Sequence, residues 1–356
     1  MLTDATNSLI ETARDGTATD ADMNAVAQSF LDAISRASRD DANAALRTLS
    51  AHFNLENASR GAFLALVCGM LVERGCDPLA IAKPLTDRIA SLLESSAELA
   101  NACADQIPES EDEDVDLVEV FEKTREQIVP TMAQQNAAWE ALEQFWRPAI
   151  AVFSLSAESR ASARHLRDFA ARIAEYNEAG HWLKLMLTVL DDEPIVAIEP
   201  QTNLGILGRI SGIVDNFQLT VLLMDVFPKS GMLAQRRVPQ EVADVYRGNG
   251  PQQSHHTVTS VWNLYMWEAI ESGLTLPDPG DYGSSAHWIW NEGTQGDIPV
   301  FDGRRVILLG PASYPRSWQS QRMFDNLPAN LEIERKLTED EINDWLQRMV
   351  AAKSAS

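Results

Sequence analysis

Glycine and proline are distributed unevenly along this chain of 356 residues. Residues 1–190 contain 5 of the 18 glycines and 5 of the 16 prolines, whereas residues 191–356 contain the other 13 and 11. Because both residues interrupt regular structure, this shift predicts long helices first and then short elements joined by tight loops. A chain of this length is also too long to fold around one ordinary hydrophobic core. We therefore expect two domains, 1–190 and 191–356.

The first domain shows apolar residues at helical spacing, three or four positions apart. One such stripe comprises Met23, Val26, Phe30 and Ile34. Gly75 follows another apolar run and is expected to end a helix there. No segment repeats at a fixed period, so an irregular α-helical bundle is predicted in preference to a repeat array.

An acidic segment interrupts this domain at about 108–116, with six carboxylates in the eight residues from Glu109. Like charges at this density repel one another, which predicts an exposed linker or loop. The spacing of its aspartates resembles the start of a calcium-binding EF-hand loop. However, Leu117 and Lys123 stand where that loop needs glycine and a bidentate glutamate. We do not expect calcium binding.

The second domain shows strand patterns at 193–200, 298–311 and 329–337. Asp302–Gly303 predicts a two-residue hairpin turn. Residues 204–228 are interpreted as two strands that meet at an Asp215–Asn216 turn. Thr338 and Glu341 form a capping box that predicts a terminal helix over about 338–353. The expected fold is α+β: the helical bundle followed by a mainly antiparallel β-sheet domain with flanking helices.

The adjacent histidines His255 and His256 precede an aromatic run that extends to residue 270. Neighbouring side chains of a strand point to opposite faces, and those of a helix diverge by about 100°. One regular element therefore cannot direct both imidazoles at one ion. Residues 258–270 fit either a strand or a helix, and the length of the stretch favours a helix from about 259.

The sequence lacks the spacings of common nucleophile, zinc-protease and nucleotide-binding motifs. The candidate catalytic residues are His255, His256, His287 and Glu292. One of the two adjacent histidines, His287 and a carboxylate would be acceptable ligands for Zn²⁺ or Fe²⁺. No spacing supports that set, so neither a metal nor a cofactor is expected. Whether the chain is an enzyme is left undecided.

Tryptophan and tyrosine are concentrated between residues 262 and 318. Most of these large rings are expected to lie in the core. A group of them at the surface would instead form a binding face. The candidate binding residues lie in two loops, 284–299 and 310–318, and are Trp288, Trp290, Tyr314, Arg316 and Trp318.

The net charge of −23, from 52 acidic and 29 basic residues, disfavours nucleic acid and anionic membranes as partners. No apolar run approaches the roughly 18 residues of a membrane span, and the N-terminus does not resemble a secretory signal. Cys68, Cys76 and Cys103 lack paired spacing, which indicates free thiols and a reducing cytoplasm.

The expected function is that of a soluble, cytoplasmic, non-catalytic interaction protein. It would bind a protein partner through the helical half or through the aromatic loops. One alternative is an enzyme with a histidine and carboxylate pocket in the 254–318 region. The other is a small-molecule or carbohydrate binder that uses the tryptophan-rich loops. The sequence does not determine the oligomeric state.

Overall fold

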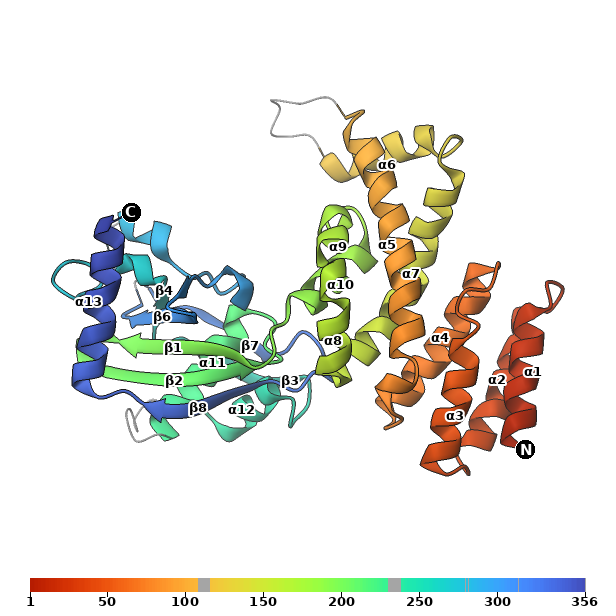
Figure 1. Ribbon diagram of the computed structural model, residues 1–356, viewed down its shortest axis with the longest axis horizontal. Coiled ribbons are helices and arrows are strands. Elements are labelled where there is room, and N and C mark those ends of the chain that lie inside the picture. Colours follow the sequence, from red (N-terminus) through yellow and green to blue (C-terminus); the bar gives the residue numbers. More distant parts are fainter. Residues whose placement is uncertain (108–115, 230–237, 279, 281, 313, 356) are drawn as a thin grey trace. The chain divides into compact units, whose positions relative to one another are not determined.

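The computed structural model describes residues 1–356 except 108–115, 230–237, 279, 281, 313 and 356 (Figure 1). Internal contacts divide the chain into two units, Met1–Leu187 and Thr188–Ser356. The first unit is helical, and the second contains a mainly antiparallel sheet with flanking helices. The α+β fold class predicted from the sequence is confirmed. The predicted acidic loop lies outside the described residues except for Asp116, which caps the helix that follows it.

The first unit is built from amphipathic helices whose apolar stripes form its core. These helices are α1 (Leu2–Arg14), α2 (Asp20–Ile34), α3 (Arg39–Ser50), α4 (Ala58–Glu73), α5 (Ala82–Ala104), α6 (Leu117–Ile128), α7 (Ala133–Leu155), α8 (Ala157–Ala163), α9 (Arg167–Ile173) and α10 (Glu178–Thr188). Gly75 ends α4 as predicted. Its φ is +103°, and Cys76 donates its backbone N–H to the carbonyl of Leu71.

The second unit is organised around a sheet with the strand order β4-β6-β1-β2-β8. Its strands are β1 (Glu193–Glu199), β2 (Leu204–Ser211), β4 (Asn263–Tyr265), β6 (Arg304–Gly310) and β8 (Asn330–Lys336), with the short β5 (Val300–Phe301) beside β6. β1 and β6 are parallel, and the other pairs are antiparallel. A separate two-stranded sheet joins β3 (Gln253–Thr259) to β7 (Ser317–Gln321).

Both faces of the main sheet are buried by helices. Alternate side chains of β1 enter two different cores, because successive residues of a strand point to opposite faces. Ile195 and Ala197 lie in one core with residues of α11 (Asn216–Lys229) and α12 (Gln240–Arg247). Val196 and Ile198 lie in the other, with residues of α13 (Glu339–Ala355).

The predicted hairpin and terminal helix are confirmed. Asp302 and Gly303 connect β5 to β6 with φ of +51° and +73°, the left-handed pair that a type I′ turn requires. Thr338 and Glu341 form the capping box that starts α13: the hydroxyl of Thr338 accepts from the backbone N–H of Glu341, whose carboxylate accepts from that of Thr338.

The prediction of a second strand after Asp215 is wrong, because residues 216–229 form α11. Asp215 caps this helix by accepting a hydrogen bond from the backbone N–H of Gln218 at 2.8 Å. The helix shows little periodicity because it is apolar on most sides, as is typical of a helix buried in a core.

The preference for a helix from residue 259 is also wrong. β3 ends at Thr259, β4 spans Asn263–Tyr265, and a short 3₁₀ turn covers Trp267–Ala269. These strands are stabilised by distant partners, since Val258 pairs with Trp318 and Leu264 with Leu309. Local periodicity does not contain that information.

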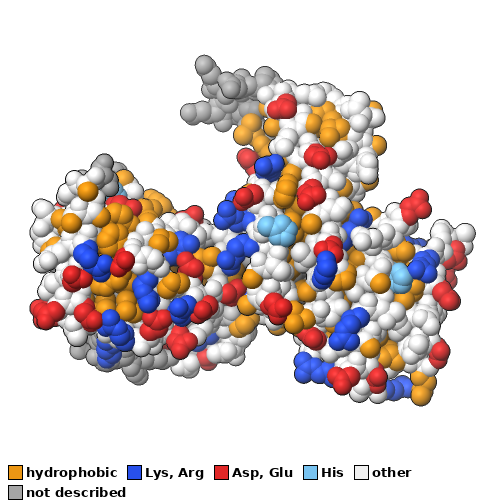
Figure 2. Space-filling view, viewed as in Figure 1, with side chains coloured by type: hydrophobic (Ala, Val, Ile, Leu, Met, Phe, Trp, Pro, Cys, Tyr) orange, Lys and Arg blue, Asp and Glu red, His pale blue; other side chains and the backbone are white. Residues whose placement is uncertain are grey.

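None of the helices among the described residues combines the length and apolar character needed to cross a bilayer. On the face shown in Figure 2, acidic and basic side chains are interspersed.

Candidate functional site

Four side chains of the second unit form what we call the aromatic–arginine patch: Trp288, Trp290, Tyr314 and Arg316. The guanidinium carbon of Arg316 lies 4.9 Å from the ring centre of Trp288, 5.4 Å from that of Trp290 and 5.1 Å from that of Tyr314. The ring centres of Trp288 and Trp290 are 5.3 Å apart. A cation within about 6 Å of a ring face is attracted by the π-electrons, so each ring stabilises the guanidinium.

The loop that carries the two tryptophans is held by backbone hydrogen bonds on both sides. Ile289 donates its N–H to the carbonyl of Leu264 in β4 at 2.9 Å. At the start of α11, Phe217 donates to the carbonyl of Asn291, and the side-chain amide of Asn216 donates to that of Trp290. The first N–H groups of a helix have no partner within the helix. Here they bind the loop and fix its conformation.

The second loop of the patch is also anchored. Arg316 precedes β7, and its carbonyl accepts a hydrogen bond from the N–H of Ser260 at 2.9 Å. Trp290 and Tyr314 are each 50% exposed, whereas Trp288 is only 8% exposed. The patch therefore consists of a nearly buried ring below, a partly exposed cation, and two rings that stand half in solvent.

The structure places Trp318, the fifth candidate binding residue, outside this patch. Trp318 lies on β7, and its indole N–H donates to the hydroxyl of Tyr246 at 2.8 Å. Its ring packs edge to face against Phe217, with 5.0 Å between ring centres. Trp318 thus joins the two-stranded sheet to the core beneath it.

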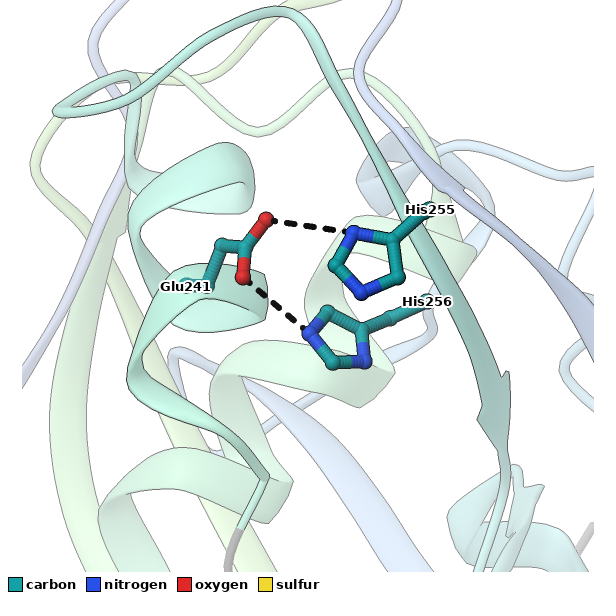
Figure 3. A group of neighbouring side chains, drawn as sticks. All are labelled: Glu241, His255 and His256. Carbon is teal, nitrogen blue, oxygen red and sulfur yellow. Dashed lines mark hydrogen bonds and ion pairs between the residues drawn. The ribbon is translucent and has the colours of Figure 1, made fainter.

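His255 and His256 lie together on β3 and face one carboxylate, that of Glu241 on α12 (Figure 3). Nδ1 of His255 is 3.6 Å from one oxygen of Glu241, and Nε2 of His256 is 3.1 Å from the other. The expectation that one regular element cannot direct both rings at one ion does not apply here, because β3 is irregular at this point. β3 bulges, with residues 254–256 opposite Ser320 alone, and a bulge breaks the alternation of side chains.

His287 and Glu292 do not belong to this group of potential ligands, which among the described residues contains Glu241, His255 and His256. The carbonyl of His287 accepts a hydrogen bond from Met266 beside the patch. Burial raises the pKa of Asp215 to about 6, and the charge of exposed Glu292 acts in the same direction as a smaller cause. Hydrogen bonds from the backbone of Gln218 and Phe217 act in the opposite direction.

A cleft of about 470 Å³ lies at the carboxyl ends of the parallel strands β1 and β6. Pro200 follows β1, Leu309 and Gly310 end β6, and Pro311 follows β6. Residues 274–278 also line the cleft. The cleft is within the usual size range for small-molecule sites.

A groove of about 850 Å³ in the first unit runs between α1, α2 and α3. Its lining mixes small apolar side chains with polar and acidic ones, among them Thr6, Asp32 and Asp41. No aromatic side chain is among its lining residues.

Sequence reasoning did not single out Glu241. It is 15 residues before His256, and no spacing rule connects a helical carboxylate to histidines on a separate strand. Only the packing of α12 against β3 brings them together. Comparisons of this chain with protein-family models, with curated proteins and with solved structures gave no match.

Proposed function

We propose that this chain is a non-catalytic interaction protein that binds a protein partner through the aromatic–arginine patch. The observation that carries the proposal is the position of Arg316, within 5.4 Å of the centres of three rings, two of which are half exposed. Tryptophan, tyrosine and arginine are the residue types that most often dominate binding energy at protein interfaces.

Preorganisation of the patch supports this function. The loop with Trp290 is bonded to β4 and to the start of α11, and Arg316 is held by its own carbonyl and by the rings around it. Ordering a long side chain at an interface costs roughly 0.5–1.5 kcal/mol. That cost is reduced here because the guanidinium is already positioned before a partner arrives.

The composition of the patch indicates the chemistry of the partner. Trp290 and Tyr314 offer apolar ring surface, and the guanidinium offers N–H donors of fixed orientation. A complementary segment would place an apolar or aromatic side chain against the rings and a carbonyl or carboxylate next to Arg316. Charge-assisted hydrogen bonds of this kind supply both affinity and orientation.

The test is a capture experiment with the full-length chain as bait in a lysate of the source cells, followed by a binding assay with the purified partner. We expect the double variant Trp290→Ala/Tyr314→Ala and the single variant Arg316→Met each to weaken binding at least tenfold. Val300→Ala is the matched control, because Val300 is 53% exposed but is not part of the patch. Equal partner affinity for all these variants and the unaltered chain would exclude the patch.

A second candidate function is binding of a small apolar molecule in the cleft at the ends of β1 and β6. It is favoured by the largely apolar lining, which includes Leu274, Leu276 and Leu309. Leu276→Trp should fill the cleft and abolish the thermal stabilisation produced by such a ligand, whereas Trp290→Ala should leave it unchanged. If Leu276→Trp has no effect on any ligand that stabilises the chain, the cleft is not the site.

A further inference from the structure

Two imidazoles and one carboxylate converge on the surface of the second unit. The ligand atoms of Glu241, His255 and His256 all lie within 4.8 Å of one another. Imidazole nitrogen and carboxylate oxygen are ligands that Zn²⁺ prefers in proteins. From this geometry we propose that Glu241, His255 and His256 form a binding site for one Zn²⁺ ion, with a fourth position open to water.

The separations between the atoms fit one ion. With metal–ligand bonds of 2.0–2.2 Å, neighbouring ligands of a tetrahedral site are about 3.4 Å apart. The two observed nitrogen-to-oxygen separations, 3.6 Å from His255 to one oxygen of Glu241 and 3.1 Å from His256 to the other, lie on either side of this value. Small rotations of exposed side chains are sufficient to close the remaining differences, since rotamers of such side chains interconvert rapidly.

The backbone places both rings on one side of β3, which a regular strand would not do. Residues 254–256 bulge opposite Ser320, and the hydroxyl of Ser254 accepts a hydrogen bond from the N–H of His256 within this bulge. As Figure 3 shows, both rings then point toward α12. The ring centres are only 4.2 Å apart, so the two nitrogens approach a common point. Bulges often serve to redirect side chains at functional sites.

The carboxylate comes from an element that is independently fixed. Glu241 lies in the first turn of α12, and this helix is anchored in the core through Val242, Val245 and Tyr246. The helix therefore holds Glu241 on the solvent side, facing β3. The side chain of His255 is 80% exposed, so solvent reaches the group and a water molecule can occupy the fourth position. A site with three protein ligands and one open position is typical of zinc that exchanges an external ligand.

The negative net charge of the chain also favours binding of a divalent cation. The net charge of −23 raises the local concentration of divalent cations around the protein. A simple ion pair between histidine and Glu241 would not need both rings. Zinc binding uses both rings and the carboxylate together, so it predicts that each of the three residues contributes to affinity for the same ion.

The test is a zinc titration of the full-length, tag-free chain by isothermal calorimetry after treatment with a chelator. Cys76→Ser serves as the background, because Cys76 is the cysteine that is not fully buried and thiolates also bind zinc. We expect one Zn²⁺ per chain. His255→Ala, His256→Ala and Glu241→Gln should each reduce the affinity at least about tenfold. His165→Ala, an exposed histidine of the first unit, is the matched control and should leave the affinity unchanged.

A second measurement distinguishes loss of the ligand from loss of the fold. Zinc should raise the thermal unfolding temperature of the background chain but not that of Glu241→Gln, whose metal-free unfolding temperature should be unchanged. Co²⁺ in place of zinc should give visible absorption bands without thiolate charge transfer. No binding at millimolar zinc, or the same affinity in the three ligand variants and in His165→Ala, would overturn the proposal and leave the group as hydrogen-bonded side chains only.

Discussion

Trp262 donates its indole N–H to Oε1 of Glu199 at 2.8 Å, which joins two buried side chains that are 63 residues apart. The other oxygen of Glu199 accepts from the hydroxyl of Thr202 at 2.5 Å. Glu199 ends β1 and Trp262 precedes β4, so this carboxylate connects the centre of the sheet to its edge strand. A buried carboxylate is tolerated because donors surround it.

Replacement of Glu199 should therefore lower the free energy of unfolding, and the loss should be larger when more of its acceptor oxygens are removed. Glu199→Ala leaves buried donors without this acceptor and should lower the free energy of unfolding by about 2–4 kcal/mol. Glu199→Gln keeps one acceptor oxygen and should cost about half as much. Urea denaturation followed by tryptophan fluorescence measures both. Equal losses for the two variants would mean that the hydrogen bonds do not account for the effect.

Asp215 should make the stability of the second unit decrease as pH rises. Burial raises its pKa to about 6 in the folded chain, whereas an unfolded aspartate has a pKa of about 3.9. The folded state thus binds the proton more tightly, and stability falls between about pH 4 and pH 6 and stays lower above that range. Asp215→Asn keeps the helix cap and removes the charge. It should stabilise the chain by about 2–3 kcal/mol at pH 7.5 and have little effect at pH 4.

Urea denaturation at the two pH values measures this difference, and Glu292→Gln provides the matched variant. Removal of the negative charge of Glu292 takes away one of the causes that raise the pKa of Asp215. The dependence of the stability on pH should then become weaker but should not disappear, because burial is the larger cause of the raised pKa. If Asp215→Asn changes stability equally at pH 4 and pH 7.5, the carboxyl does not titrate in this range.

Features that depend on a few neighbouring residues could be predicted from the sequence. The hairpin turn at Asp302–Gly303, the helix end at Gly75 and the capping box of Thr338 with Glu341 each follow from local chemistry. The structure confirms all three, because local preference and tertiary packing agree at these positions.

Features that depend on distant contacts could not be predicted in this way. α11 is apolar on most sides because it is buried, so its sequence resembles two buried strands. The bulge that aligns His255 with His256 exists only because β3 pairs with β7 some 60 residues later. The two aromatic loops were identified from composition, but only the fold brings Arg316 next to Trp288.

Within the aromatic–arginine patch, we expect the more buried tryptophan to contribute more to the stability of the fold than the half-exposed one. Trp288 is nearly buried and packs on Tyr265, Trp290 and Arg316. Trp288→Ala should therefore lower the free energy of unfolding by about 3–5 kcal/mol. Trp290→Ala, at a half-exposed ring, should cost less than about 1.5 kcal/mol. Thermal or urea unfolding of the two variants checks the ranking, and a larger loss for Trp290→Ala would contradict the described burial.

Gly212 should be far less replaceable than Gly303, although both have positive φ, +68° and +73°. A Cβ at residue 212 would lie 1.9 Å from the carbonyl oxygen of Pro328, whereas one at residue 303 would meet no atom within 4 Å. Gly303→Ala should lower the free energy of unfolding by about 1–2 kcal/mol, which is the cost of placing an alanine in the left-handed conformation. Gly212→Ala should lower the free energy of unfolding by at least about 2 kcal/mol more, because the backbone at Pro328 must move to admit the Cβ. Similar unfolding free energies for the two variants would show that the loop at Pro328 yields easily.

The three cysteines should differ sharply in reactivity. Cys68 and Cys103 are fully buried, whereas Cys76 is half-buried near the end of α4. Burial raises the pKa of all three thiols, so the reactive thiolate is scarce at neutral pH. With a thiol reagent at pH 8, the native chain should therefore titrate one thiol slowly, and denaturant should release the other two. Cys76→Ser should abolish the native phase alone. A second thiol that reacts before unfolding would show that the core around α4 and α5 opens locally, since reagent can reach Cys68 or Cys103 only through such an opening.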